Sequence, residues 1–196
     1  MAGESGAQFM ENNKIKISGQ HQVFRRSWRY NVEGVGELEA YPNRDSLIYK
    51  NVFDIEQVDT MIRATLRYKG WSETWHQIVR LGMTNENMPI PNLNEKSYAE
   101  FTEMFLPLVY TTSKLEARVA NYLQASPTGK IMENLRWLGL FSSEKIKGNP
   151  KTAAQVLEDL LKDKMPLPKG ARDMVILAHE LIAEFPVGVG IIGAGF

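Results

Sequence analysis

The spacing of apolar residues changes along this chain of 196 residues. Up to Tyr68, apolar and polar residues alternate with period two, which is typical of half-buried strands. From Trp71 to Lys164 the apolar residues recur at intervals of three and four, which indicates amphipathic helices. An apolar run that favours a strand returns at 174–177. We therefore predict an α+β fold: a mixed or antiparallel sheet with covering helices and an all-helical insertion.

These segments divide the chain into four predicted parts. Residues 1–13 are small and polar, so we expect a disordered tail. Residues 14–82 are predicted to form a β-rich domain, and residues 83–168 form the helical insertion. Residues 169–196 are expected to return a strand to the sheet and to end in a glycine-rich tail.

Capping and turn residues set the predicted element boundaries. Strands are predicted at 14–18, 60–68 and, as a hairpin with glycine punctuation, 30–41. A turn at 42–46 precedes a short helix capped by Asp45 or Ser46. Longer helices are predicted at 71–82 (capped by Ser72, stopped by Gly82), 97–110, 113–123 (with a Ser113–Glu116 capping box), 128–138 and 152–164.

Composition excludes several kinds of partner and chemistry. The 23 basic and 23 acidic residues balance, so global charge does not attract nucleic acid or an anionic membrane. The absence of cysteine excludes disulfides, thiol nucleophiles and cysteine metal ligands, and it fits a cytoplasmic protein. No apolar run reaches the roughly 20 residues that span a bilayer, and the N-terminus lacks the apolar centre of a signal peptide.

The strand predicted at 60–68 carries the most site-like pattern. Because side chains alternate across a strand, Arg63, Thr65 and Arg67 share one face, and Arg44 lies in the turn before it. A guanidinium pairs with a carboxylate through two parallel hydrogen bonds, so this cluster favours a di- or tricarboxylate ligand. Alternatively, the arginines only tie the sheet together by pairing with nearby acidic residues, namely Glu37, Glu39, Asp45 and Asp59.

The histidines and tryptophans favour structural roles. His21, His76 and His179 lack the i, i+3 or i, i+4 spacing of a helical metal site, so no metal is predicted. His76 lies between apolar neighbours on a predicted helix, which favours a structural role over acid–base catalysis. Trp71 and Trp75 are one helical turn apart, which favours core packing or, alternatively, a wall beside the arginines. No Gly-x-Ser-x-Gly motif of a serine hydrolase occurs.

The C-terminal residues 187–196 are rich in glycine. Gly188, Gly190 and Gly193 match G-x-G-x-x-G, the pattern of a dinucleotide-binding turn. That motif needs an apolar strand before the glycines and a helix after them, whose N-terminus holds the pyrophosphate. If residues 187–192 are that strand, the motif begins at Gly193 and this chain does not complete it. We therefore predict a flexible or strand-like tail and no cofactor-binding residues in this chain.

Five motifs occur in one order, collinear over about residues 14–185, and they resemble the glutamate-forming saccharopine dehydrogenases, also called saccharopine reductases. The motifs are Tyr41-Pro42-Asn43-Arg44-Asp45-Ser46, Arg63-Ala64-Thr65-Leu66-Arg67-Tyr68-Lys69-Gly70-Trp71, Arg80-Leu81-Gly82, Leu135-Arg136-Trp137-Leu138-Gly139-Leu140-Phe141-Ser142 and Arg172-Asp173-Met174-Val175-Ile176-Leu177. The sequence departs from the family at Ala64, where glycine is usual, and after Phe185.

The resemblance implies an activity. Members of this family are oxidoreductases that use NAD or NADP to interconvert saccharopine with glutamate and aminoadipate semialdehyde in lysine metabolism. This chain resembles their middle, substrate-binding and dimerisation domain, with the Rossmann domain of the family absent. It would therefore be an excised or engineered fragment, a homodimer, and inactive by itself. The sequence does not distinguish NAD from NADP.

The resemblance also implies that six residues bind the substrate, and it assigns no catalytic acid or base. Saccharopine carries three carboxylates, which suits the arginine cluster. The residues are Arg44, supported by Asn43 and Asp45, and a second contact segment of Thr65, Leu66 and Arg67. Two alternatives stay open: a non-catalytic dimerising module that binds a carboxylate metabolite or nothing, and a relative that acts on another opine-like amine.

Overall fold

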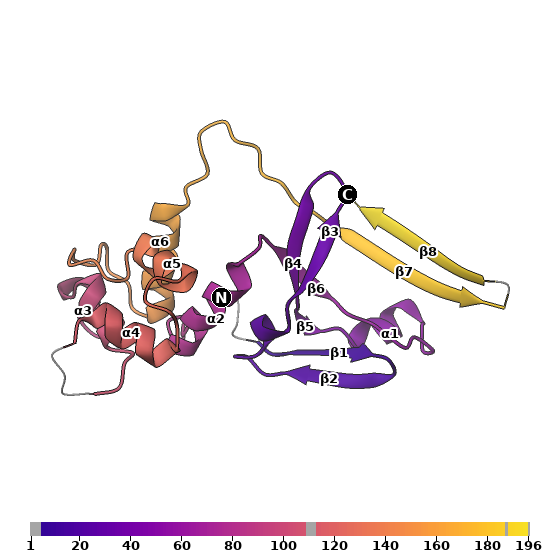
Figure 1. Ribbon diagram of the computed structural model, residues 1–196, viewed down its shortest axis with the longest axis horizontal. Coiled ribbons are helices and arrows are strands. Elements are labelled where there is room, and N and C mark those ends of the chain that lie inside the picture. Colours follow the sequence, from indigo (N-terminus) through magenta and orange to yellow (C-terminus); the bar gives the residue numbers. More distant parts are fainter. Residues whose placement is uncertain (1–4, 109–112, 187, 196) are drawn as a thin grey trace.

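The computed structural model describes residues 5–108, 113–186 and 188–195. Helices α3 to α6 lie on one side of the molecule and the strands, together with α1, on the other, with α2 between them (Figure 1). The strands are β1 (Ala7–Glu11), β2 (Lys14–Ser18), β3 (Trp28–Val32), β4 (Gly36–Pro42), β5 (Arg44–Asp45), β6 (Ala64–Arg67), β7 (Ala178–Phe185) and β8 (Gly188–Gly195). The helices are η1 (Val23–Arg26), α1 (Ile48–Phe53), α2 (Trp71–Leu81), η2 (Leu93–Glu95), α3 (Tyr98–Glu103), α4 (Leu115–Leu123), α5 (Lys130–Leu138) and α6 (Ala153–Lys164).

The described strands form three small sheets, in the orders β2-β1-β5, β3-β4-β6 and β7-β8. Strands β1 and β5 pair in parallel, whereas the other pairs are antiparallel. Helices α3 to α6 all lie within the predicted insertion at 83–168. One mixed sheet and two antiparallel sheets, combined with a helical block, confirm the predicted α+β class. The boundaries proposed for the four parts stay predictions.

The N-terminal segment corrects the predicted disordered tail at 1–13. Residues Ala7–Glu11 form β1 and pair with β2 through a tight turn at Asn12 and Asn13, both with positive φ. Asparagine tolerates this left-handed conformation, which the turns of two-residue hairpins require. Ala7 and Phe9 are buried, because alternate residues of β1 face the core. The small, polar composition hid this alternation.

A side chain from the neighbouring sheet caps the start of helix α2. The N–H groups of Gly70 and Ser72 donate to the two carboxylate oxygens of Glu39, on β4, at 2.8 and 3.4 Å. A carboxylate at this position satisfies free amides and suits the helix dipole. The predicted cap, Ser72, is wrong, because Gly70 is the N-cap residue and the hydroxyl of Ser72 is buried without a partner. The predicted stop at Gly82 is confirmed by its positive φ.

An aromatic stack joins the sheet to the helices. The ring of Trp71 stacks on Tyr41 (centroids 5.7 Å apart) and on Trp75 (5.1 Å). Phe24 meets both Tyr41 and Trp71 edge to face, at 4.9 and 5.5 Å. These residues and the apolar faces of α4, α5 and α6 belong to one buried cluster. Leu135 on α5 and Val156 on α6 are fully buried in it. The core therefore runs continuously from β4 through α2 into the helical block.

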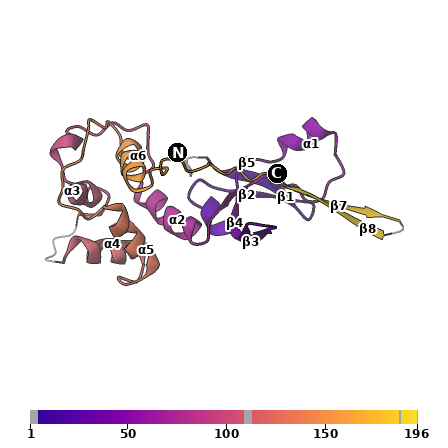
Figure 2. The ribbon, with the colours of Figure 1, turned by 90° about the horizontal axis from the view of Figure 1, so that it is seen from above.

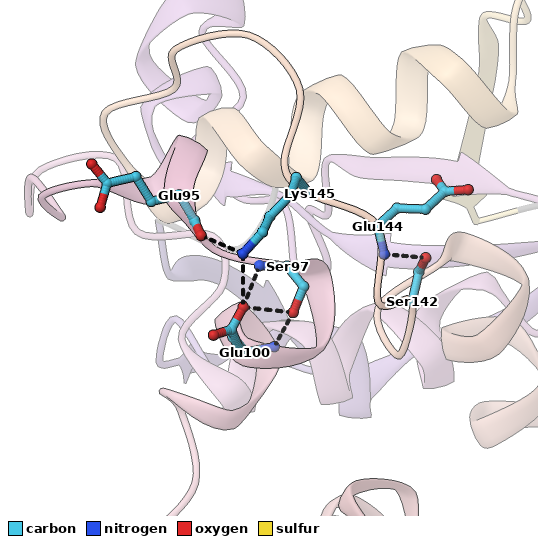
Figure 3. Close-up of polar contacts among 6 residues, drawn as sticks. All are labelled: Glu95, Ser97, Glu100, Ser142, Glu144 and Lys145. Atoms are coloured by element: carbon cyan, nitrogen blue, oxygen red, sulfur yellow. Dashed lines mark hydrogen bonds and ion pairs between the residues drawn. The ribbon is translucent and has the colours of Figure 1, made fainter.

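The helical block contains a capping box at Ser97, the first residue of the predicted helix 97–110 (Figure 3). The carboxylate of Glu100 accepts from the N–H and the hydroxyl of Ser97, at 2.7 and 2.8 Å, and these bonds lower the pKa of Glu100. Lys145 donates to the carbonyl of Glu95 (2.6 Å) and lies 3.7 Å from Glu100. This network holds the loop between α5 and α6, which contains Lys145, against the start of α3. The predicted helix is too long, because α3 ends at Glu103 and residues 109–112 are outside the described chain.

The predicted capping box at Ser113 and Glu116 is wrong. Helix α4 begins at Leu115, with Lys114 as its N-cap residue and no side-chain cap. Glu116 instead accepts from the Nε of Arg136, on α5, at 2.6 Å. A cross-helix ion pair therefore replaces the predicted local cap.

The C-terminal segment differs from the predicted strand at 174–177. Residues 171–177 are extended without strand pairing, and strand structure begins at Ala178. Strands β7 and β8 form a hairpin that projects away from the other elements (Figure 2). Both faces of the hairpin carry exposed apolar side chains, such as those of Leu181, Ile182 and Val189. The glycine-rich tail is therefore strand-like, one of the two predicted alternatives.

We predict that Glu39→Ala lowers the free energy of unfolding by about 1–2 kcal/mol, because it leaves two helix amides without an acceptor. Urea denaturation measures this change. The control is Glu33→Ala in the exposed β3–β4 turn, which should stay within about 0.5 kcal/mol of the parent chain. Equal losses for the two variants would contradict the capping role of Glu39.

Candidate functional site

The pairing of β4 with β6 brings the two predicted contact segments together. Tyr41 lies opposite Thr65, and the ladder continues beyond β4 because the N–H of Asn43 donates to the carbonyl of Arg63 at 3.0 Å. The side-chain Nδ2 of Asn43 donates to the hydroxyl of Thr65 at 2.8 Å. The predicted residues Asn43 and Thr65 are therefore in direct contact, although 22 positions separate them.

Arg44 occupies an unusual backbone position. Its φ is +57°, in the left-handed region that costs a non-glycine residue about 1–2 kcal/mol. The parallel pairing of Arg44 with Ala7 holds it there, and its side chain is exposed. The carboxylate of Asp45 accepts from the N–H of Leu47 at 2.8 Å, so Asp45 organises the backbone that follows Arg44. A fixed, strained backbone here aims a solvent-facing guanidinium.

Arg67 lies on the aromatic stack. Its guanidinium carbon is 5.1 Å from the ring centroid of Trp71, and its Nη1 donates to the carbonyl of Leu66 at 2.8 Å. A cation over an indole is attracted by the ring face, at roughly 0.5–1 kcal/mol in an exposed position. This contact orients the guanidinium while leaving further N–H groups of its five donors for a ligand.

The neighbouring carboxylates are engaged elsewhere. Glu37 lies near Arg29 (3.7 Å) and Lys69 (4.0 Å), and Glu39 accepts the amides of α2. Arg63 donates to the hydroxyl of Tyr49 at 3.4 Å. Within the described residues, no ion pair neutralises the predicted arginines, Arg44, Arg63 and Arg67. The described structure therefore gives no support to the alternative that they only tie the sheet together.

A cavity of about 570 Å³ lies against the β3–β4–β6 sheet. Thr65, Leu66 and Arg67 contribute to its wall, whereas Asn43, Arg44 and Asp45 do not. The opposite wall is the extended segment 174–178 with Glu180. The aromatic residues of the wall, Trp28, Tyr30 and Tyr68, were missed as site residues. The available signal was the period-two spacing of Trp28 and Tyr30 on β3.

His76 lines a different cleft, together with His21, Arg25, Arg80 and Glu73. Burial, followed by the positive charges of Arg25 and Arg80, lowers the pKa of His76. Its Nδ1 is buried without a hydrogen-bond partner. The lowered pKa favours the neutral form of the His76 ring, and the ring lies in a different cleft from the cavity beside Arg67.

The described residues offer no group of three or more histidine or acidic side chains that could hold a metal. None of the described helices is long and apolar enough to cross a bilayer. The glycine-rich residues of β8 pair with β7 in a hairpin, so the described part of that segment does not form the strand-to-helix turn that cradles a pyrophosphate.

Comparison with known proteins places this geometry in a family. Residues 1–189 match the family described as saccharopine dehydrogenase C-terminal domain. The chain is 30% identical to the NADP⁺, L-glutamate-forming saccharopine dehydrogenase of Schizosaccharomyces pombe, with 96% of this chain and 43% of that protein covered. It is 29% identical to mitochondrial alpha-aminoadipic semialdehyde synthase of Bos taurus, covering 77% of this chain and 16% of that protein.

A solved structure shows the same fold. The apo saccharopine dehydrogenase (L-Glu forming) of Saccharomyces cerevisiae aligns with a TM-score of 0.72 and 26% identity, covering 99% of this chain and 45% of that one. The chain is therefore an α+β domain of an oxidoreductase family. It belongs to the saccharopine dehydrogenase C-terminal domain family and spans less than half the length of these fungal relatives. The resemblance inferred from the five motifs is confirmed.

We predict that the ring of His76 titrates at a lower pH in the folded chain than in urea. Because the unfolded state then binds more protons, this histidine's contribution to stability is complete above its unfolded-state pKa and is lost as pH falls through the folded-state pKa. NMR titration of the ring measures both values. Arg25→Gln should raise the folded-state pKa, whereas Arg29→Gln, outside the cleft, should not. A folded-state value at or above the urea value would contradict the effect of burial.

Proposed function

We propose that this chain is the substrate-binding part of a glutamate-forming saccharopine dehydrogenase of lysine metabolism. The observation that carries the proposal is the set of arginines without carboxylate partners, Arg44, Arg63 and Arg67, around the Asn43–Thr65 contact. Membership of the family supports the choice of substrate. The unneutralised guanidinium groups favour a ligand with several carboxylates.

The spacing of the two outer arginines suits an extended ligand. In the β4–β6 ladder the backbone of Arg67 lies opposite that of Glu39. Arg44 is five positions further along the chain from Glu39. At about 3.3 Å per residue and one strand spacing sideways, their Cα atoms lie at most roughly 17 Å apart. Two long side chains that reach inward can hold carboxylates at the opposite ends of saccharopine. Glutamate alone is too short to satisfy both.

In the proposed reaction, saccharopine loses a hydride from the methylene carbon beside its secondary amine, and the amine nitrogen loses its proton to solvent. Water then hydrolyses the resulting imine to glutamate and aminoadipate semialdehyde. NADP, the cofactor in the names of the fungal relatives, accepts the hydride when bound. This chain's residues bind and orient the substrate carboxylates, and a part of the longer enzyme outside this chain holds the cofactor. The choice of NADP over NAD rests on those names.

We also propose that the protein is a homodimer located in the cytoplasm. The exposed apolar side chains of the β7–β8 hairpin support association, because monomeric proteins rarely leave contiguous apolar surface in water. Sedimentation of a 22.3 kDa species at micromolar concentration would contradict the dimer.

We predict that Arg67→Ala, in the intact parent enzyme, costs about 2–5 kcal/mol of substrate binding, because a carboxylate loses its charged partner. Steady-state kinetics with saccharopine and NADP measure the change. Arg29→Ala is the matched control, since Arg29 is an exposed arginine of the same sheet that faces Glu37. Unchanged kinetics in Arg67→Ala would contradict the site. No turnover by the intact parent would favour the non-catalytic, carboxylate-binding alternative.

A further inference from the structure

A second cavity, of about 360 Å³, is lined by residues of α2 and α5, the end of α6 and the segment 68–70. Figure 1 shows these helices at the joint between the strands and the helical block. Most of its wall is apolar, with indole rings from α2 and α5 and a thioether after α6. Its aromatic and apolar lining residues include Tyr68, Trp71, Trp75, Ile78, Trp137, Leu161 and Met165. No residue of this lining other than Tyr68 lines the cavity beside Arg67.

The three indoles differ in how they are packed. Trp71 and Trp75 stack on each other, and Trp75 is buried to 7% exposure. Trp137 is 54% exposed and has no ring partner among the described residues. An indole left half in water beside an apolar cavity presents a surface that another flat ring can cover favourably. Trp137 therefore offers an open ring face at the edge of this cavity.

Polar groups stand at the edge of this apolar wall. The Nδ2 of Asn134 donates to the hydroxyl of Thr74 at 2.7 Å, which fixes α5 against α2. Lys130 and Lys69 also line the cavity, and their ion pairs, with Glu133 at 3.4 Å and Glu37 at 4.0 Å, are exposed. Such surface pairs contribute little, so either ammonium group can turn toward a ligand.

We propose that this cavity binds a planar aromatic ring that carries an anionic group, such as an aromatic carboxylate. A mostly apolar pocket with a few polar groups at its edge is the usual form of a small-molecule site, and this volume lies within the usual range. The ring stacks on Trp137, and the anionic group lies beside Lys130 or Lys69. The proposal does not depend on the saccharopine site.

The cavity is connected to Arg67 through one side chain. The ring of Trp71 lines the cavity and also lies 5.1 Å from the guanidinium carbon of Arg67. A ligand that changes the position of Trp71 therefore changes the support under Arg67.

Fluorine NMR of the 196-residue chain labelled with 5-fluorotryptophan tests this proposal residue by residue. The chain has four tryptophans, and single Trp→Phe variants assign their resonances. Indole-3-acetate is the probe, and indole-3-acetamide is its neutral counterpart. We expect a saturable shift of the Trp137 resonance and no shift of Trp28, which lines the other cavity. The acetamide should bind about threefold more weakly or worse, as the loss of an exposed ion pair implies.

Two exposed lysines provide matched variants. Lys130→Gln should weaken the binding of indole-3-acetate about threefold, whereas Lys147→Gln, whose side chain pairs with Asp163 outside the cavity, should not. Non-saturating shifts of all four resonances would overturn the site. Equal affinity for acetate and acetamide would overturn its preference for anions.

Discussion

Two hydrogen bonds, from the first amides of α2 to the carboxylate of Glu39, join the helical block to the sheet. Glu39 belongs to β4, so these bonds determine where α2 leaves the sheet and how it is directed. With that direction set, Trp71 lies on Tyr41, and Trp75 carries the apolar stack onward to the helices. The buried core is continuous across this joint, so the strands and the helical block share one hydrophobic cluster.

The candidate substrate site depends on the same joint. Arg67 lies at the end of β6, opposite Glu39, and its guanidinium lies over Trp71. The carboxylate of Glu39 accepts hydrogen bonds from the helix amides and forms no ion pair with Arg67. A structural cap thus has a functional consequence: the arginine is supported by an aromatic ring and remains open to an anion. Arg44, the second arginine, has a left-handed backbone held by pairing with β1, and its side chain is exposed.

Local patterns predicted much of this fold because the signals lie within a few residues of each other. The alternation at β2, the glycines of the β3–β4 hairpin and the Gly82 stop of α2 are of this kind. Strand β1 was missed for two reasons. Its turn consists of two asparagines, and only two of its residues, Ala7 and Phe9, form the buried face. The Ser72 cap failed because a carboxylate from a distant segment, Glu39, accepts the first amides of α2. The Ser113 cap failed because α4 begins at Leu115, with Lys114 as its N-cap residue. The site was predictable as a set of residue types on β6, but the support of Arg67 by Trp71 and the Asn43–Thr65 contact depend on the register between β4 and β6.

The most direct test of the account is calorimetric titration of the 196-residue chain with saccharopine. A preformed set of open arginines predicts saturable binding of saccharopine and weaker binding of glutamate, which has fewer carboxylates to offer. A folded chain that takes up neither ligand at millimolar concentration would contradict the claim that the arginines form a binding site within this domain.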